Sequence, residues 1–278
     1  MIDRQKWTDF RVGMTSDELV SSGLFFKRKE WDLGSERFIG MRFSELVPHL
    51  IRESRFHPTR FTPPKWIREF QGGIFQVNLK IYKVKPHEQP GQIRQTDGGG
   101  QDYWITIGIG PDGELDGYNP LKDPEVAQEG FVTALFSKVL LNNLSSPGSF
   151  GGDAHFPLLD IVHPPTSENV ERLVSEIKGR CGLEKFFVLR SSNKGMMVVG
   201  PELIDEENFT AFLFDSLLLN HLEVANEFWV DDRWVARSTQ NFVKDLERLN
   251  SQKYGGILRI TALPPVKPEE PTVIAASF

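Results

Sequence analysis

Phe156-Pro157-Leu158-Leu159-Asp160-Ile161-Val162 is the stretch that decides the fold, because it begins a segment of alternating strand and helix patterns. A short apolar run ended by turn residues, here His163-Pro164-Pro165, predicts a buried strand. This strand carries a carboxylate, Asp160, in its interior, where an acid is costly unless it is paired or binds a metal ion. Asp160 is therefore the strongest site candidate in the chain, and a strand-end aspartate that caps a turn is the alternative.

The residues after this strand continue the alternation. We predict a helix at 166–182, strands at 185–190 and 196–199, a helix at 205–220 and a last strand at 228–230. Apolar residues at helical spacing indicate the helices, and the polar turn Ser191-Ser192-Asn193-Lys194-Gly195 joins the two middle strands. This order predicts a split βαββαβ sheet with both helices on one face and the other face open. Asp160 and the acidic pair Asp231-Asp232 would then meet on the open face.

Three motifs in this segment resemble those of the archaeo-eukaryotic primase-polymerase superfamily, in a bacterial primase-like form. The first family motif is Asp-apolar-Asp, and here it is Asp160-Ile161-Val162. The second is a Ser-rich turn that leads through Gly-x-His, and here it runs from Ser191 to Met197. The third is an apolar residue before Asp, Val230-Asp231, and a closing segment from Gly256 to Thr261 precedes Lys267. The similarity covers roughly 110 residues and depends on the order and spacing of motifs that are each weak alone.

The resemblance implies a fold, a metal site and a nucleotide site. The fold class is α/β, in the α+β sense, with an RRM-like C-terminal sheet joined to an N-terminal α/β module. Mg²⁺ or Mn²⁺ would position the triphosphate and the attacking hydroxyl for nucleotidyl transfer. The residues implied are Asp160 and Asp231 as catalytic acids, Asp160, Asp231 and Asp232 as metal ligands, and Arg190, Ser191, Ser192, Lys194 and Arg259 as nucleoside-triphosphate contacts. For the nucleoside-triphosphate contacts there are two alternatives: residues 191–195 are a plain hairpin turn, and Arg259 has an ion-pairing role.

Two departures from the family pattern fall where its chemistry is concentrated. Val162 stands where the second carboxylate is expected, and Met197 stands where the triphosphate-contacting histidine is expected. Valine supplies no metal ligand, and methionine cannot donate a hydrogen bond to a phosphate. Asp160 and Asp231 could still hold one Mg²⁺ or Mn²⁺ with water as the other ligands. We therefore expect a degenerate catalytic centre.

The composition is that of an ordinary soluble protein, with 39% hydrophobic and 25% charged residues. The single cysteine, Cys181, excludes an internal disulfide framework and a multi-cysteine metal site. A reducing cytoplasm is therefore the expected setting. The N-terminus has no apolar core of signal-peptide length and no apolar run approaches a membrane span, so we expect no membrane partner.

The charge is unevenly distributed along the chain. Residues 1–94 hold 17 Lys and Arg against 11 Asp and Glu, whereas the remaining residues hold 15 against 27. Such asymmetry indicates either a basic module that faces a polyanion or two subdomains that attract each other. Basic and aromatic residues alternate from Arg52 to Phe70, as in surfaces that hold single-stranded nucleic acid by stacking and phosphate attraction. An irregular connector whose aromatic side chains fill the core is the alternative. The candidate nucleic-acid contacts are Arg60, Lys65, Trp66 and Arg68.

Residues 1–147 are predicted to form the N-terminal module, and residues 148–278 the primase-polymerase-like domain. The predicted elements of the module are helices at 16–22, 44–53 and 123–143 and strands at 72–84 and 103–109. The helix at 123–143 depends on Asp123-Pro124 as its start and on the spacing of Phe131, Leu135 and Val139. No internal repeat is visible.

Together these features predict a primase-polymerase-like protein with a retired catalytic centre that binds nucleic acid, a nucleotide or a protein partner. The resemblance alone implies a context of DNA replication, repair or mobile-element defence. A working primase-polymerase that keeps one metal ion is the second hypothesis. The third is a structural adaptor whose sheet face is filled by the N-terminal half of the chain.

Overall fold

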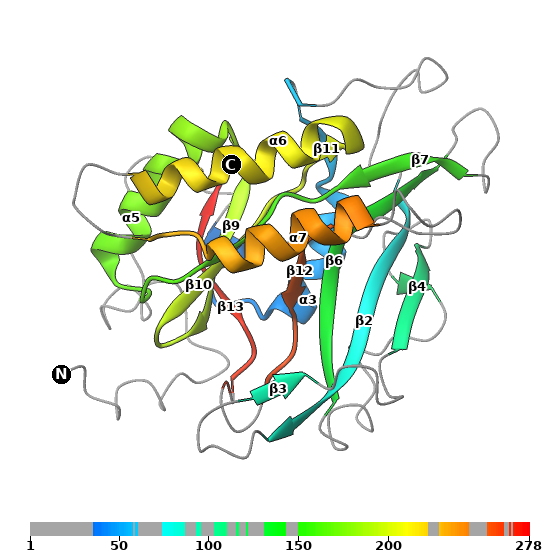
Figure 1. Cartoon of the computed structure of the whole chain (residues 1–278), viewed down its shortest axis with the longest axis horizontal. Helices are drawn as coiled ribbons and strands as arrows, with labels where there is room; N and C mark the ends of the chain where they lie inside the picture. The colour runs from blue at the N-terminus through cyan, green and yellow to red at the C-terminus, as the bar shows by residue number, and fades with distance from the viewer. Residues whose placement is uncertain are drawn as a thin grey trace.

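The computed structural model shows a mixed α+β protein with two β-sheets (Figure 1). Residues of both sheets pack together in one apolar cluster, and a second apolar cluster lies between the smaller sheet and helices α5 and α6. The structure describes residues 36–57, 59–60, 74–86, 93–95, 103–109, 115–116, 121, 131–142, 150–221, 228–244, 255–263, 267 and 269–278. The predicted helix at 16–22 lies outside these residues.

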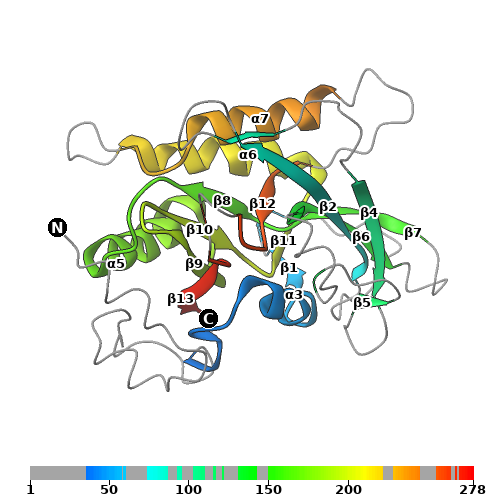
Figure 2. The ribbon, with the colours of Figure 1, turned by 90° about the horizontal axis from the view of Figure 1, so that it is seen from below.

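Helices cover the sheets from two sides. In Figure 2, α6 and α7 lie on one side of the strands and α3 lies on the other. None of the helices described here is long and apolar enough to cross a membrane. Among the described residues the helices are α3 (Phe43–Arg52), α5 (Ser167–Glu176), α6 (Glu206–Ser216) and α7 (Asp232–Lys244), with 3-10 turns at Glu36–Phe38 and Leu217–His221 and a π-helical turn at Ile177–Cys181.

The larger sheet has nine strands among the described residues, and its members come from both halves of the chain. Three strands of the second half join it: β7 pairs with β6 and with β11, and β12 pairs with β6. Neighbours are antiparallel except for β1 and β11, which run parallel. The main path is β1 (Arg55–Phe56), β11 (Glu202–Asp205), β7 (Phe150–His155), β6 (Phe131–Asn142), β2 (Ile74–Pro86), β4 (Tyr103–Ile109) and β5 (Leu115–Asp116), with β12 (Ile257–Arg259) beside β6 and β3 (Ile93–Gln95) beside β2.

The smaller sheet is antiparallel and contains the stretch that decides the fold. Its order is β13 (Thr272–Ser277), β9 (Phe186–Ser192), β10 (Gly195–Val199) and β8 (Leu158–Ile161). An isolated bridge between Ile161 and Val230 continues the pairing on the outer side of β8. This bridge places Asp231, the residue after Val230, directly beside β8.

Both faces of the smaller sheet are covered. Leu159, Ile161 and Val198 pack against the apolar sides of α5 and α6. The opposite face, with Leu158 and Met197, packs against α3 and against the larger sheet. The expectation of an open face was wrong, because α3 is strongly amphipathic and buries its apolar side there.

Most of the predicted elements of the second half are confirmed. The helix at 166–182 begins where expected, because the Thr166 hydroxyl accepts a hydrogen bond of 3.3 Å from the Asn169 N–H. Its π-helical last turn ends at Gly182, whose positive φ of 66° suits glycine. The two middle strands, the helix after them, and the strands at 72–84 and 103–109 are also present.

The predicted helix at 123–143 was wrong, because its described part is strand β6. Phe131, Leu135 and Val139 are four residues apart, and a spacing of four repeats on one face of a strand as well as of a helix. Residues 132–139 are all buried, as in a strand covered on both faces, so the polar alternation that marks a strand is missing.

The predicted last strand at 228–230 is reduced to the single bridge at Val230. The chain then turns into α7 instead of continuing along β8. Asp231 caps this helix, so the extended segment ends at Val230 and the helix begins within the acidic pair.

Candidate carboxylate site

Asp160 lies in β8 and pairs with Met197 of β10. Side chains alternate along a strand, so Asp160 lies on the same face as Leu158. Its own carbonyl accepts a hydrogen bond of 3.0 Å from the N–H of Asp231. The two acids that the sequence analysis selected therefore occupy adjacent positions, although they come from distant parts of the chain.

The side chain of Asn220 fixes this arrangement. Its Oδ1 accepts hydrogen bonds of 2.7 Å from the N–H groups of both Trp229 and Val230. Its Nδ2 donates to the Val230 carbonyl at 3.0 Å. Asn220 thus holds residues 229 and 230 in an extended conformation beside β8, which sets the position of Asp231.

Asp231 also has a structural task. Its Oδ1 accepts hydrogen bonds from the N–H groups of Arg233 at 3.0 Å and Trp234 at 3.3 Å, the geometry of a helix N-cap on α7. The Arg233 Nε lies 3.3 Å from the same oxygen. Asp232 is the first residue of α7 and is exposed. Of the acidic pair, only Asp231 faces the protein.

Burial makes the Asp160 carboxyl hard to ionise. It raises the pKa of Asp160 from 3.8 to about 6, and the charge of Asp231 acts in the same direction. The positive charges of Lys267 and Arg259 oppose this rise and favour the ionised form, with Lys267 the stronger of the two. Burial in turn lowers the pKa of Lys267, and the charge of Asp160 opposes that effect. Asp160, Asp231, Lys267 and Arg259 thus form one electrostatic group, which we call the Asp160 site.

Arg259 is bound by carbonyl oxygens of its surroundings. Its Nη2 donates to the Ser191 carbonyl at 2.8 Å, and its Nη1 donates to the carbonyls of Glu269, at 3.1 Å, and Thr261. Burial lowers the pKa of Arg259 to about 10. The guanidinium is therefore a fixed positive charge inside the fold.

The other predicted nucleotide contacts are mostly engaged as well. Arg190 is buried and its Nη2 forms an ion pair of 2.6 Å with Glu269. Ser191 is buried, and the Ser192 hydroxyl accepts a hydrogen bond of 3.2 Å from the Lys194 N–H. Lys194 itself is exposed at the hairpin turn. These contacts are those of a closed hairpin, with Lys194 as its outward charge.

Arg60 is the one predicted nucleic-acid contact among the described residues. Its Nη2 forms an ion pair of 2.6 Å with Asp215, and its guanidinium lies 5.8 Å from the centre of the Phe212 ring. The charge of Arg60 is therefore used within the protein. Lys65, Trp66 and Arg68 lie outside the described residues.

The two departures from the family motifs have different surroundings. Val162 is 42% exposed, and its N–H donates to the Trp229 carbonyl at 2.9 Å. Met197 is 3% exposed and belongs to the core shared with α3. Neither side chain supplies an oxygen or an imidazole to the Asp160 site. In the part of the chain that the structure describes, no three His, Cys, Asp or Glu side chains are grouped so that they could hold a metal ion.

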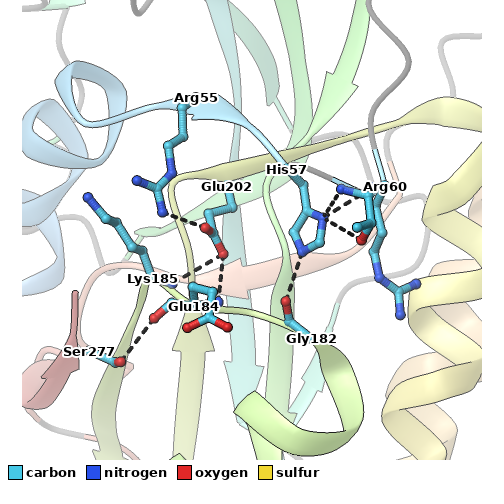
Figure 3. Close-up of polar contacts among 9 residues, drawn as sticks. Arg55, His57, Arg60, Gly182, Glu184, Lys185, Glu202 and Ser277 are labelled. Carbon is cyan, nitrogen blue, oxygen red and sulfur yellow. Dashed lines mark hydrogen bonds and ion pairs between the residues drawn. The ribbon is translucent and has the colours of Figure 1, made fainter.

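A second buried polar group escaped the sequence analysis (Figure 3). Glu202 is 1% exposed, and its Oε1 lies 2.5 Å from Nη2 of Arg55. Its Oε2 accepts hydrogen bonds from the N–H groups of Glu184 at 2.8 Å and Lys185 at 3.1 Å. Arg55 and Glu202 are 147 residues apart, so no local pattern could have revealed the pair.

His57 completes this region in Figure 3. Its Nδ1 accepts hydrogen bonds from the N–H groups of Thr59, at 3.2 Å, and Arg60, at 3.1 Å. Nε2 therefore carries the proton and donates to the Gly182 carbonyl at 2.9 Å. The group ties the segment around β1 to the end of the π-helical turn, which is a structural role.

Comparisons with protein-family models, with curated proteins and with solved structures find no match for this chain.

Proposed function

We propose that the protein is a primase-polymerase-like protein that has lost nucleotidyl transfer and acts as a nucleic-acid-binding module in DNA replication, repair or defence. The observation that carries this proposal is the composition of the Asp160 site. Two acids lie in adjacent positions, yet one of them caps a helix and two cationic side chains act on the other. A site with this balance of charges suits a binding protein better than two-metal catalysis.

The order of strands supports an RRM-like sheet. With Val230 counted as the last strand, the first predicted strand, β8, lies between the third, β10, and the last, and β9 is on the far side of β10. Helices α5 and α6 pack on one face, as a split βαββαβ unit requires. The strand β13 is an addition to this unit.

Strand synthesis tests the loss of catalysis. Wild-type protein would be incubated with a primed or unprimed template, labelled nucleotides and Mn²⁺, and the products separated by size. We expect no product from the wild type or from Asp160→Ala. Synthesis by the wild type that Asp160→Ala abolishes would instead establish an active enzyme, the hypothesis that the adjacency of Asp160 and Asp231 favours.

Binding is tested by fluorescence anisotropy of labelled single-stranded DNA and RNA at several salt concentrations. We expect the logarithm of the affinity to fall linearly with the logarithm of the salt concentration. Lys65→Gln and Arg68→Gln should weaken binding, whereas Arg60→Gln should mainly reduce stability, because Arg60 is paired with Asp215. Arg180→Gln is the matched control, since Arg180 pairs with Glu176 on the exposed side of α5.

A structural adaptor is the second candidate, and the covered sheet face favours it. Aromatic residues on an RRM sheet bind bases only where that face is exposed, and here α3 occupies it. An adaptor would show no salt-dependent affinity for either nucleic acid. Absence of binding in the anisotropy experiment would therefore favour the adaptor over the nucleic-acid-binding module.

A further inference from the structure

Helix α6 and the 3-10 turn that follows it are apolar on two sides. The inner side packs in the apolar cluster between the smaller sheet and the helices, through Phe209, Phe212 and Leu213. The outer side also carries large apolar residues, Phe214, which is 55% exposed, and Leu218, which is 47% exposed. A surface helix of a globular protein normally has a single apolar side, so the outer side indicates a further contact.

The exposed residues of this segment follow one line along the helix. Their spacing of four, three, four and three residues is that of a coiled-coil seam, in which the side chains of two helices interlock. Residues next to this line in the sequence, such as Phe212 and Leu219, are buried. We call the line the α6 stripe, and it consists of Glu207, Ala211, Phe214, Leu218 and His221.

The two ends of the α6 stripe carry complementary groups. Glu207 is a carboxylate at the N-terminal end, and the His221 imidazole at the C-terminal end can donate a hydrogen bond to a carboxylate. A second copy that lies antiparallel brings the C-terminal end of one stripe to the N-terminal end of the other, as a two-fold interface requires. Asp215, the neighbour of Phe214, forms an ion pair of 2.6 Å with Arg60, so its charge is neutralised beside the middle of the stripe.

The sizes of the side chains fit the same arrangement. A two-fold axis between Phe214 and Leu218 places Phe214 of each copy against Leu218 of the other, because the order of residues is reversed in the second helix. The same axis places His221 of each copy beside Ala211 of the other. The small side chain of Ala211 leaves room for the imidazole, and Glu207, one turn away, can accept its hydrogen bond.

We propose that the protein forms a symmetric dimer in which the α6 stripes of two copies pack antiparallel. The stripe spans about four turns of helix. The interface is therefore small, and we expect a weak dimer with a dissociation constant on the order of micromolar. This inference goes beyond the proposed function and does not depend on it, because the stripe contains no candidate nucleic-acid contact and no residue of the Asp160 site.

Sedimentation velocity over a range of protein concentrations measures the dimer. We expect the wild type to dimerise, and Phe214→Ser and Leu218→Ser each to weaken the dimer at least roughly tenfold, because the two-fold axis removes each apolar side chain twice. Both side chains are exposed, so these substitutions leave the core intact, and circular dichroism checks that the variants are folded. Val162→Ser is the matched control, because Val162 is 42% exposed but follows β8, outside the stripe.

Cysteine cross-linking tests the antiparallel arrangement. The natural Cys181 is buried, and burial raises the pKa of its thiol to about 12, so it should not react. We expect a disulfide-linked dimer when Ala211→Cys and His221→Cys proteins are mixed under mild oxidation. Either variant alone should form little, because the two equivalent positions lie about 15 Å or more apart along the helices. Arg52→Cys is the control, since Arg52 is exposed on α3, on the opposite side of the strands from α6 (Figure 2).

Three results would overturn the inference. The first is a wild type that stays monomeric at about a hundred times the expected dissociation constant, because the stripe would then bind a different partner. The second is a dimer that Phe214→Ser and Leu218→Ser leave unchanged, which would place the interface elsewhere. The third is a mixture of Ala211→Cys and His221→Cys that forms no more disulfide than either variant alone, which would exclude the antiparallel arrangement.

Discussion

Glu202 is fully buried and Asp160 is partly buried, and the two carboxylates differ in their hydrogen-bond partners. Every oxygen of the Glu202 carboxylate has a partner: Arg55 on one side and the N–H groups of Glu184 and Lys185 on the other. Asp160 has its charge opposed by Lys267 and Arg259, but among the described residues no hydrogen-bond donor contacts its carboxylate. Burial therefore raises its pKa to about 6.

The difference teaches that burial alone does not identify a functional acid. An acid whose oxygens are all hydrogen-bonded stabilises the fold, and its partners are set by the fold. An acid that is buried with few donors is costly for stability, which is common where a residue serves another purpose. By this criterion Glu202 is structural and Asp160 is the candidate for function.

The largest expected effect is on the structural side of this comparison. Glu202→Ala would leave two buried N–H groups and the Arg55 guanidinium without their acceptor. We expect the free energy of unfolding to fall by about 3 to 5 kcal/mol, measured by urea denaturation. Glu176→Ala, which removes an exposed ion pair between Glu176 of α5 and Arg180 of the π-helical turn, should change it by less than about 0.5 kcal/mol. If both variants lost a similar amount of unfolding free energy, the hydrogen bonds of Glu202 would contribute no more to stability than an exposed ion pair does.

The pH dependence of the free energy of unfolding tests the Asp160 half of the comparison. The folded-state pKa of Asp160, about 6, is above its ordinary value of 3.8, so the folded protein binds this proton more tightly than the unfolded chain. The wild type should therefore lose stability relative to Asp160→Asn as the pH rises from about 4 to about 6. The relative loss should total about 3 kcal/mol and stay constant above pH 6.

Urea denaturation of both proteins at several pH values measures this difference. Glu202→Gln serves as the comparison, because both oxygens of the Glu202 carboxylate already have hydrogen-bond donors. A difference between wild type and Asp160→Asn that does not depend on pH would mean that Asp160 has an ordinary carboxyl. The comparison between the two acids would then lose its basis.

The local signals in the sequence predicted the smaller sheet well. Thr166 as a cap, the apolar spacing of α5, and the polar turn between β9 and β10 act within a few residues, so sequence alone is sufficient. The adjacency of Asp160 and Asp231 came from the order of elements together with the resemblance. It is seen in the hydrogen bond of 3.0 Å between the Asp231 N–H and the Asp160 carbonyl.

The failures have physical causes. Strand β6 was mistaken for a helix because both of its faces are buried, so apolar and polar residues do not alternate along it. In addition, apolar residues four positions apart lie on one face of a strand as well as on one face of a helix. The sheet face was expected to be open, but α3 comes from the other half of the chain, and no local pattern says where an amphipathic helix docks. The partners of Glu202 and those of the Arg259 guanidinium are equally non-local. Sequence therefore located the acids but not what surrounds them.

The smallest expected effect concerns Asp231, which lies between the two kinds of acid because it caps a helix and also faces Asp160. Asparagine caps helices about as well as aspartate, whereas alanine does not cap. If the cap is its main task, Asp231→Ala should lower the free energy of unfolding by about 1 kcal/mol, and Asp231→Asn should change it by only a few tenths. Urea denaturation at pH 7 compares the two variants. Equal losses in both would mean that the charge of Asp231, and not its cap, matters, so that Asp231 would join Asp160 as a functional acid.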